Sequence, residues 1–164
     1  MQEFDRVIIS SPLGMIEITG SHQVIFSDLF LDSKKAKPAK VPASLQKCVT
    51  QLEEYFSGKR KTFDIPLQPN GTSFQRHVWD ELLKIPYGKT ISYLKLAQQL
   101  GDEKSIRAVA SANGKNPIAI IIPCHRVIGS QGEMVGYGGG IKRKEWLLAH
   151  EKGEEQLGLF DSMG

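Results

Sequence analysis

The sequence of 164 residues predicts an α+β fold, and two patterns along the chain indicate it. Short β-prone runs at residues 7–9, 15–18 and 24–26 alternate with turn-forming segments, which is typical of an antiparallel sheet. From about residue 71 onward, apolar residues recur at helical spacing instead. We therefore expect two domains, residues 1–70 and residues 71–152, followed by an acidic tail at residues 153–164.

The composition is that of an ordinary globular protein, with 40% hydrophobic residues, 24% charged residues and a formal net charge of +3. Since the tail is acidic, the rest of the chain is more basic than this sum. Such an excess suits brief contact with a polyanion, although a solvated surface explains it equally well. No secretory signal or membrane span is evident, and the two cysteines, Cys48 and Cys124, are far apart. A reducing compartment, the cytoplasm, is expected.

The first domain is expected to begin with three strands, separated by turns at residues 11–14 and 20–22. After a loop at residues 33–40, Pro42 fits the first turn of a helix. Apolar residues recur there at helical spacing, and Gly58 ends the pattern. Residues 62–67 then predict a further strand, and residues 66–71 a linker.

The second domain is expected to begin with a helix that ends near residues 86–88. Ser92 can cap a second helix, which Gly101 closes, and residues 104–112 predict a third. Two short helices joined by a tight glycine-containing turn suggest a helix-turn-helix, although a generic helical hairpin has the same pattern. Small residues along the third helix would allow close approach to a minor groove, or would simply pack on the core.

The apolar run at residues 118–122 predicts a buried strand, and Pro123 would end its pairing. Cys124 then stands at the end of this strand, with His125 beside it. A thiolate is a strong nucleophile, and a neighbouring imidazole increases its population. The alternative is a buried cysteine with no reactivity.

Residues 123–127, Pro-Cys-His-Arg-Val, resemble the active-site signature of the methylated-DNA–protein-cysteine methyltransferases. Further segments resemble this family in the same order, at residues 91–93, 107–109, 114–117, 136–140 and 144–148. The resemblance implies a ribonuclease H-like N-terminal domain and a winged-helix-like C-terminal domain with a helix-turn-helix. It also implies direct-reversal repair of double-stranded DNA, without a cofactor. The alkyl group of O6-alkylguanine, and also of O4-alkylthymine, would move irreversibly to Cys124 in a single turnover.

The resemblance also assigns roles to catalytic residues. Cys124 would be the nucleophile, and His125 would take its proton through a water while Glu151 orients the imidazole. Tyr93 would donate a hydrogen bond or proton to the leaving purine, and Arg107 would fill the space that a flipped nucleotide leaves. The residues alone would instead indicate an exposed carboxylate at a helix end for Glu151 and an ordinary amphipathic surface residue for Tyr93.

The resemblance further predicts a DNA surface and a substrate pocket. Gly138 stands where many members carry serine, so we hypothesise a roomier pocket that tolerates alkyl groups larger than methyl. Backbone carbonyls of Cys124 and Val127 would accept the guanine amino group. The expected DNA contacts are Arg107, Ala108, Ser111, Asn113 and Lys115. The expected pocket residues are Asn116, Val127, Met134, Tyr137 and Gly138.

The tail contains a short segment that resembles the peptide by which bacterial DNA-processing proteins dock on the replication sliding clamp. The residues concerned are Gln156, Leu157, Leu159 and Phe160. A tail folded back on its own domain is the alternative. No metal site is expected, because the histidines are dispersed and the only other cysteine is Cys48. The chain is expected to be a monomer.

Three rival functions remain open at this point. A Cys-His-Glu hydrolase would share the nucleophile, but it would need an oxyanion hole and would turn over many times. A non-catalytic binder of alkylated DNA would carry another residue in place of Cys124. A winged-helix regulator would be expected to have more side chains that read bases.

Overall fold

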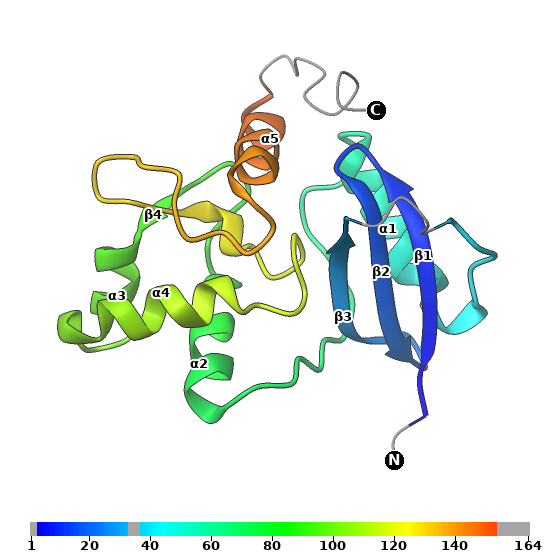
Figure 1. The fold of residues 1–164 in the computed structure, drawn as a ribbon, viewed down its shortest axis with the longest axis horizontal. Coiled ribbons are helices and arrows are strands. Elements are labelled where there is room, and N and C mark those ends of the chain that lie inside the picture. Colours follow the sequence, from blue (N-terminus) through cyan, green and yellow to red (C-terminus); the bar gives the residue numbers. More distant parts are fainter. Residues whose placement is uncertain (1–2, 33–36, 154–164) are drawn as a thin grey trace. The chain divides into compact units, whose positions relative to one another are not determined.

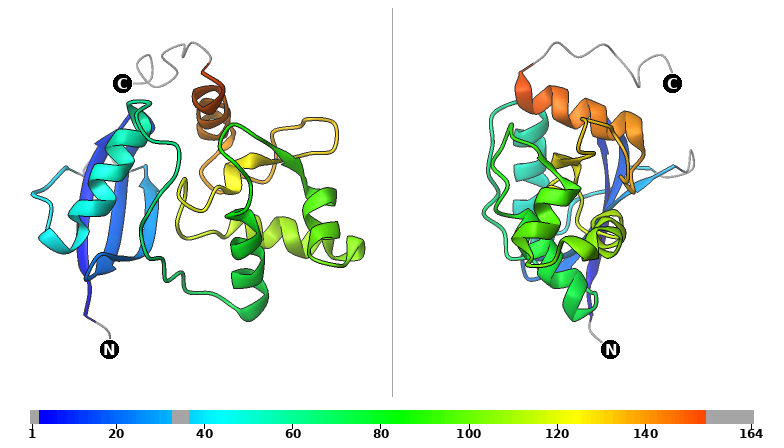
Figure 2. Two further views of the ribbon diagram at one scale, coloured as in Figure 1. Left: turned by 180° about the vertical axis from the view of Figure 1, so that it is seen from behind. Right: turned by 90° about the vertical axis from the view of Figure 1, so that its left-hand side faces the viewer.

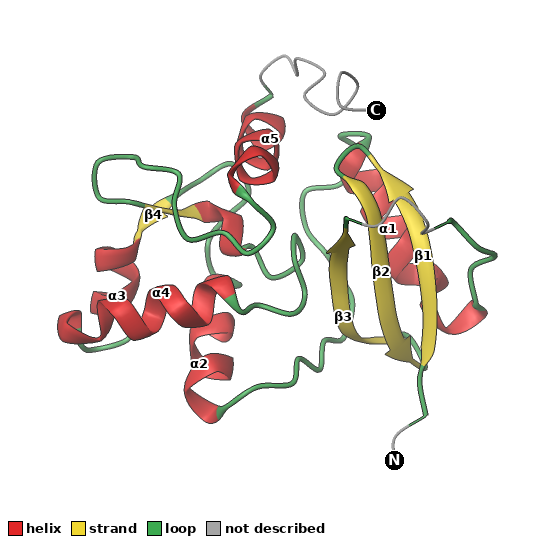
Figure 3. Ribbon diagram, viewed as in Figure 1, coloured by secondary structure: helices red, strands yellow, loops and turns green. Residues whose placement is uncertain are grey.

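The structure is a computed structural model, and it describes residues 3–32 and 37–153 (Figure 1). The chain divides between Asn70 and Gly71 into two compact units. Figure 3 shows a sheet and helical structure in the first unit and mainly helices in the second. The predicted α+β class is confirmed. Within the described residues, no helix is both long enough and apolar enough to cross a membrane.

The first unit contains a three-stranded antiparallel sheet with the order β1-β2-β3, as the sequence predicts. The strands are β1 (Asp5–Ser11), β2 (Gly14–Ser21) and β3 (Val24–Leu31). Val7 pairs with Ile18 and Ile9 with Ile16, and all four side chains are buried. This alternation gives the sheet one apolar face that must be covered.

Helix α1 (Gln46–Phe56) covers one face of this sheet (Figure 2). A short 3-10 turn at Ala43–Leu45 precedes it, directly after Pro42. Val49, Leu52 and Tyr55 are buried along the inner side of the helix. The helix ends just before Gly58, whose φ of 79° is a left-handed conformation that glycine adopts easily. The predicted helix is confirmed, with its α-helical part starting slightly later than Pro42 suggests.

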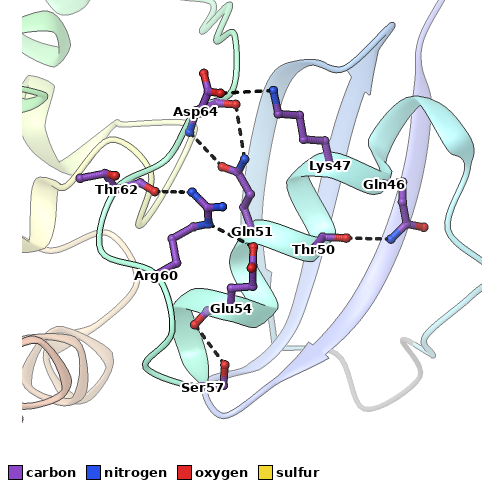
Figure 4. Close-up of polar contacts among 9 residues, drawn as sticks. All are labelled: Gln46, Lys47, Thr50, Gln51, Glu54, Ser57, Arg60, Thr62 and Asp64. Atoms are coloured by element: carbon purple, nitrogen blue, oxygen red, sulfur yellow. Dashed lines mark hydrogen bonds and ion pairs between the residues drawn. The ribbon is translucent and has the colours of Figure 1, made fainter.

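The strand predicted at residues 62–67 is wrong. This segment forms a single parallel bridge, between Ile25 and Leu67, and otherwise runs beside α1. Figure 4 shows what holds it there: the Gln51 side chain accepts a hydrogen bond from Asp64 N at 2.9 Å and donates one to Asp64 O at 3.4 Å. At Asp64 the backbone thus pairs with the side-chain amide of Gln51 rather than with a neighbouring strand. β-propensity does not predict such a contact.

The second unit is built from helices around a small parallel sheet. Thr72 and Gln75 form a capping box at the start of its first helix. The sheet was not predicted, because each of its strands has only two residues. The elements are α2 (Ser73–Leu82), β4 (Ile91–Ser92), α3 (Tyr93–Gln99), α4 (Ile106–Gly114), β5 (Val127–Ile128) and α5 (Ile141–Lys152).

The predicted pair of short helices is present as α3 and α4. Ser92 caps α3 by accepting a hydrogen bond from Lys95 N at 3.0 Å. A 3-10 turn at Glu103–Ser105 leads into α4. Trp79 of α2 is buried and donates from Nε1 to Ala112 O at 2.8 Å, which attaches α2 to α4. The helix pair is therefore fixed to the core of this unit through a buried hydrogen bond.

The strand predicted at residues 118–122 is also wrong. Ile121 N donates to Ala119 O at 2.8 Å and Ile122 N donates to Ile118 O at 3.1 Å, so the segment forms compact turns. Ile120 has a φ of 72°, a rare conformation for a β-branched residue. The run is largely buried, as expected, but a short apolar run has no period that separates a strand from a buried turn.

Candidate active site

Cys124 lies in a 3-10 turn, Cys124–Arg126, between Pro123 and β5 rather than at the end of a strand. The residue is 4% exposed. Asn116 holds the turn from one side, because its Nδ2 lies 3.1 Å from Cys124 Sγ and donates to Ile122 O at 2.8 Å. An N–H directed at the sulfur stabilises negative charge there. Asn116, predicted as a pocket residue, thus contacts the candidate nucleophile directly.

His125 and Glu151 lie together in the interior of the unit, although 26 residues separate them. His125 Nε2 is 2.7 Å from Glu151 Oε2, and both side chains are buried. A carboxylate can only accept, so Nε2 carries the hydrogen. Nδ1 of His125 is buried and has no hydrogen-bond partner among residues 3–32 and 37–153. The imidazole therefore keeps a lone pair at Nδ1 that can accept a proton.

Arg126 is the third member of this buried group. Its Nε donates to Glu151 Oε1 at 2.8 Å and its Nη2 to Glu151 Oε2 at 3.1 Å. Nη1 donates to Ile85 O at 2.7 Å. Gly88 N adds a further hydrogen bond to Glu151 Oε1 at 3.2 Å. The carboxylate thus accepts from His125, from both prongs of the guanidinium and from a backbone amide.

The electrostatics of this group fix its charge states. Burial alone would raise the pKa of Glu151, but the hydrogen bonds and charges of His125 and Arg126 outweigh it and lower this pKa far below its usual value. Burial lowers the pKa of His125, and the charges of Arg126 and Lys144 act in the same direction, against the opposing effect of Glu151. At neutral pH, Glu151 is ionised and His125 is neutral.

Tyr93, at the start of α3, is buried close to the sulfur. Its hydroxyl donates to Val135 O at 2.8 Å, and Asn113 Nδ2 lies 3.4 Å from it. Burial raises the pKa of Tyr93 to about 12, and the charge of Cys124 adds to this effect. The phenol therefore remains protonated at neutral pH and acts as a donor.

Lys144 of α5 is fully buried. Its Nζ donates to Val127 O at 2.5 Å and to Val135 O at 2.8 Å, and it lies 5.7 Å from the centre of the Tyr93 ring. Burial lowers the pKa of Lys144 to about 8, although the charge of Cys124 opposes this shift. A cation thus connects the segment after the Cys-His-Arg turn to the loop that precedes α5. Lys144 also donates to the carbonyl oxygen of Val127, which was expected to accept a hydrogen bond from the guanine amino group.

The loop before α5 carries three predicted pocket residues. Tyr137 is buried, Met134 is half-buried and Gly138 is exposed. A Cβ placed on Gly138 would lie 2.5 Å from Gly114 O, at the end of α4. A serine at position 138 would therefore require one of two backbones to move. Glycine at position 138 therefore allows the loop backbone to approach the end of α4 closely, in addition to any effect on pocket size.

Four of the predicted DNA contacts share the exposed side of α4 or its end. They are Arg107, Ala108, Ser111 and Lys115. The fifth, Asn113, is not on this surface: it is fully buried, and its Nδ2 donates to Cys124 O at 3.2 Å. Asn113 was predicted as a DNA contact, but its side chain is buried, because position 113 lies on the inward face of α4 with the buried positions 109 and 112. Asn113 instead joins α4 to the Cys-His-Arg turn.

Arg126 and Lys144 are the residues of the site to which the sequence analysis gave no role. A signal for Lys144 was present. Lys144, Leu147, Leu148 and Glu151 follow the spacing of one helix face, so an otherwise apolar stripe contains two charges. Charged residues on a buried face need partners, which points to a polar network.

Some predictions fall outside this arrangement. The tail residues Gln156, Leu157, Leu159 and Phe160 lie outside the described residues. Within residues 3–32 and 37–153, no cluster of three histidine, cysteine, aspartate or glutamate side chains could hold a metal ion.

Comparison with family models assigns both units. Residues 6–69 match the ribonuclease-like domain of 6-O-methylguanine DNA methyltransferase, and residues 73–153 match the DNA binding domain of the same family. Together the two matches cover nearly all of the described chain.

Individual relatives agree with these matches. The chain is 45% identical over 160 residues to a methylated-DNA–protein-cysteine methyltransferase of Mycobacterium tuberculosis H37Rv, which covers 93% of this chain and 96% of that protein. It is 45% identical over 152 residues to the protein of the same name from Methanosarcina barkeri, covering 88% and 95%. A crystal structure of Mycobacterium tuberculosis OGT in complex with DNA aligns with a TM-score of 0.83 at 44% identity, covering 93% of this chain and 95% of that chain.

Proposed function

This chain belongs to the 6-O-methylguanine DNA methyltransferase family, and we propose that it repairs DNA by direct reversal, with Cys124 as the alkyl acceptor. The observation that carries the assignment of Cys124 is its position beside His125. The Nδ1 of His125 has no partner within the described part of the chain and can accept a proton, while Glu151 holds Nε2. The substrate is O6-alkylguanine in double-stranded DNA, and O4-alkylthymine is a second substrate of the same chemistry.

The first step creates the nucleophile. The proton of the Cys124 thiol passes through a bridging water to Nδ1 of His125, and Glu151 stabilises the imidazolium that forms. The N–H of Asn116, 3.1 Å from Sγ, stabilises the developing thiolate. Lys144 places a further positive charge in the same interior. Residues of three separate segments therefore favour charge on one sulfur.

The second step is an in-line displacement at the alkyl carbon. A carbon–sulfur bond forms as the carbon–oxygen bond breaks, and the purine that leaves takes a proton. Tyr93 is the donor for this proton or for a hydrogen bond to the purine, because its hydroxyl stays protonated in this interior. The product at Cys124 is a thioether, which water does not hydrolyse under ordinary conditions. Each molecule therefore acts once.

The DNA-binding part of the proposal concerns α4. Its exposed side carries small residues between two cations, Arg107 and Lys115, which suits close approach to a minor groove without reading the sequence. The attacked carbon is inaccessible in a stacked base, so the nucleotide must rotate out of the duplex. Arg107 fills the space that the nucleotide leaves.

The mass of the intact protein tests the proposal. After incubation with excess O6-methylguanine DNA, the mass should increase by one methyl group at Cys124, and Cys124→Ser should stay unchanged. Cys48→Ser is the matched control, because it removes the other thiol, which is buried in the first unit, and should react like the wild type. Release of guanine over many turnovers without a stable adduct would support a Cys-His-Glu hydrolase. Tight binding without any adduct would support a lesion-binding protein.

The sequence of the tail supports a second, independent contact. Gln156, Leu157, Leu159 and Phe160 form a clamp-binding motif, by which the protein would dock on the bacterial sliding clamp. Binding to purified clamp should be lost in the double variant Leu159→Ala, Phe160→Ala. Unchanged binding in this variant would remove the motif from the proposal. The protein is further proposed to act as a monomer in the cytoplasm.

A further inference from the structure

We propose that Arg126 is a positioning residue that shares Glu151 with His125 and thereby keeps the resting imidazole neutral and ready to accept a proton. Arg126 follows His125 in the sequence and binds both oxygens of the same carboxylate, at 2.8 and 3.1 Å. It touches neither the sulfur nor the substrate in the proposed reaction. Its effect would reach Cys124 through Glu151 and His125.

The first argument is geometric. Glu151 Oε2 accepts from both His125 Nε2 and Arg126 Nη2, so the imidazole and the guanidinium share one oxygen. Arg126 is fixed independently by its hydrogen bond from Nη1 to Ile85 O at 2.7 Å. The guanidinium also lies 5.7 Å from the centre of the Tyr87 ring. Arg126 thus holds the carboxylate from a rigid position rather than following it.

The second argument is charge balance. The side chains of His125, Arg126 and Glu151 are 0%, 8% and 1% exposed, so a net charge on the group is costly. With Arg126 and Glu151 charged, the group is neutral only if His125 is neutral. Without Arg126, a buried histidine–carboxylate pair is neutral either as imidazolium with carboxylate or as imidazole with carboxylic acid, and while Glu151 stays ionised it favours the imidazolium. A histidine that is already protonated cannot take a proton from Cys124.

The third argument concerns the reaction itself. When the thiol proton moves to His125, the group gains one positive charge while Cys124 gains one negative charge. The summed charge of Cys124 and the His125–Arg126–Glu151 group therefore stays at zero, and the charge of Arg126 makes a neutral resting His125 compatible with this transfer. The charged groups that face His125 are Glu151 and Lys144 from α5 and Arg126 beside it, and burial and these two cations lower its pKa against the pull of Glu151.

The experiment follows His125 by NMR in protein labelled at the histidine ring carbons, with His125→Gln to assign its signal. In the wild type, His125 should remain neutral at pH 7. In Arg126→Gln, which keeps an N–H donor but removes the charge, the titration midpoint should move up by about 1–3 pH units. Arg126→Lys keeps the charge and should leave the midpoint near its wild-type position. Lys84→Met removes a cation that is 73% exposed in the same unit and should change nothing.

The rate of alkyl transfer gives the second readout, and this part rests on the proposed function. In Arg126→Gln the acidic limb of the pH–rate profile should move upward with the histidine midpoint. A purely structural role would lower the rate at every pH without moving the limb. An unmoved midpoint, or a wild-type His125 protonated at pH 7, overturns the inference. If Arg126→Gln fails to fold, the titration of the wild type can still overturn the inference, because a His125 that is protonated at pH 7 contradicts it. If His125 titrates as expected but the protein transfers no alkyl group, the proposed function is contradicted and the inference about Arg126 is not.

Discussion

Two polar clusters, one in each unit, contain similar side chains in different surroundings. In the first unit, Lys47 lies 3.7 Å from Asp64, with side chains that are 45% and 92% exposed (Figure 4). Arg60 lies 3.1 Å from Glu54 in the same cluster. In the second unit, Arg126 and Glu151 are 2.8 Å apart and almost entirely buried.

This difference in burial decides what each cluster can do. Exposed ion pairs contribute about 0–1 kcal/mol each, because water and salt screen them. A buried pair is different: removal of one partner leaves an uncompensated charge and costs about 3–5 kcal/mol. The cluster of the first unit therefore fixes a chain segment, while the group of the second unit controls protonation. The predictions below compare the two, from the largest expected effect to the smallest.

The largest effect is expected for Glu151→Gln. The substitution leaves the charge of Arg126 buried without its carboxylate, so the free energy of unfolding at pH 7 should fall by about 3–5 kcal/mol. Urea denaturation measures it, and Glu54→Gln in the first unit is the matched control with an expected loss below about 1 kcal/mol. Equal losses in the two variants would contradict the comparison.

The same variant has a predicted pH dependence. The pKa of Glu151 is lowered by folding, so its contribution to stability is complete above the ordinary carboxyl pKa of 4.5. The contribution is lost as the pH falls toward the lowered value. The difference in stability between wild type and Glu151→Gln should therefore shrink in acid and stay constant between pH 6 and 8.

The next effect is expected for Lys144. Its pKa is lowered from 10.5 to about 8 by folding, so the unfolded chain binds more protons between these values and stability rises with pH. The rise amounts to at most about 3 kcal/mol. Lys144→Met should lack this rise when unfolding is measured from pH 8 to 10.5, while the exposed control Lys142→Met should retain it.

A smaller effect is expected for Gln51→Ala, the buried member of the first cluster. The substitution removes two hydrogen bonds to the backbone of Asp64, which should cost about 1–2 kcal/mol. Hydrogen exchange at the Asp64 amide should increase with it. An unchanged exchange rate would show that the segment after α1 is held by other contacts.

The smallest effect is expected for Lys47→Met. Its ion pair with Asp64 is exposed, so the free energy of unfolding should change by less than about 0.5 kcal/mol. Added salt should abolish even this difference. A loss above about 1 kcal/mol would mean that the difference in exposure does not determine how much the ion pairs of the two clusters contribute to stability.

The elements with a clear period could be predicted from the sequence. The alternation around Val7 and Ile18 gave the sheet, and Ser92 gave the start of α3. The runs at residues 62–67 and 118–122 were misread as strands for different reasons. Gln51, 13 residues away from Asp64, holds the first run, and β-propensity does not identify such a partner. The second run forms compact turns of its own beside Asn116, and a short apolar run has no period that separates a strand from a buried turn.

The residues of the site likewise include some that the sequence identified and others that it did not. Cys124 and His125 were identified because they are adjacent in a recognisable string. Glu151 was placed by resemblance, and its geometry with His125 could not be derived from a spacing of 26 residues. Arg126 was given no role and Asn113 was placed on the DNA surface, because the roles of both residues depend on their burial. A charged or amide side chain reads as a surface residue until the packing around it is known.

The close approach of Gly138 to Gly114 O has a consequence for how this protein could evolve. The loop that carries Gly138 and the last turn of α4 meet backbone to backbone, so position 138 cannot gain a side chain unless one of the two backbones moves. A lineage that adapts to bulkier lesions would therefore acquire its substitutions elsewhere along the loop. Met134 and Val135, which retain contact with solvent, are the positions where such variation can accumulate.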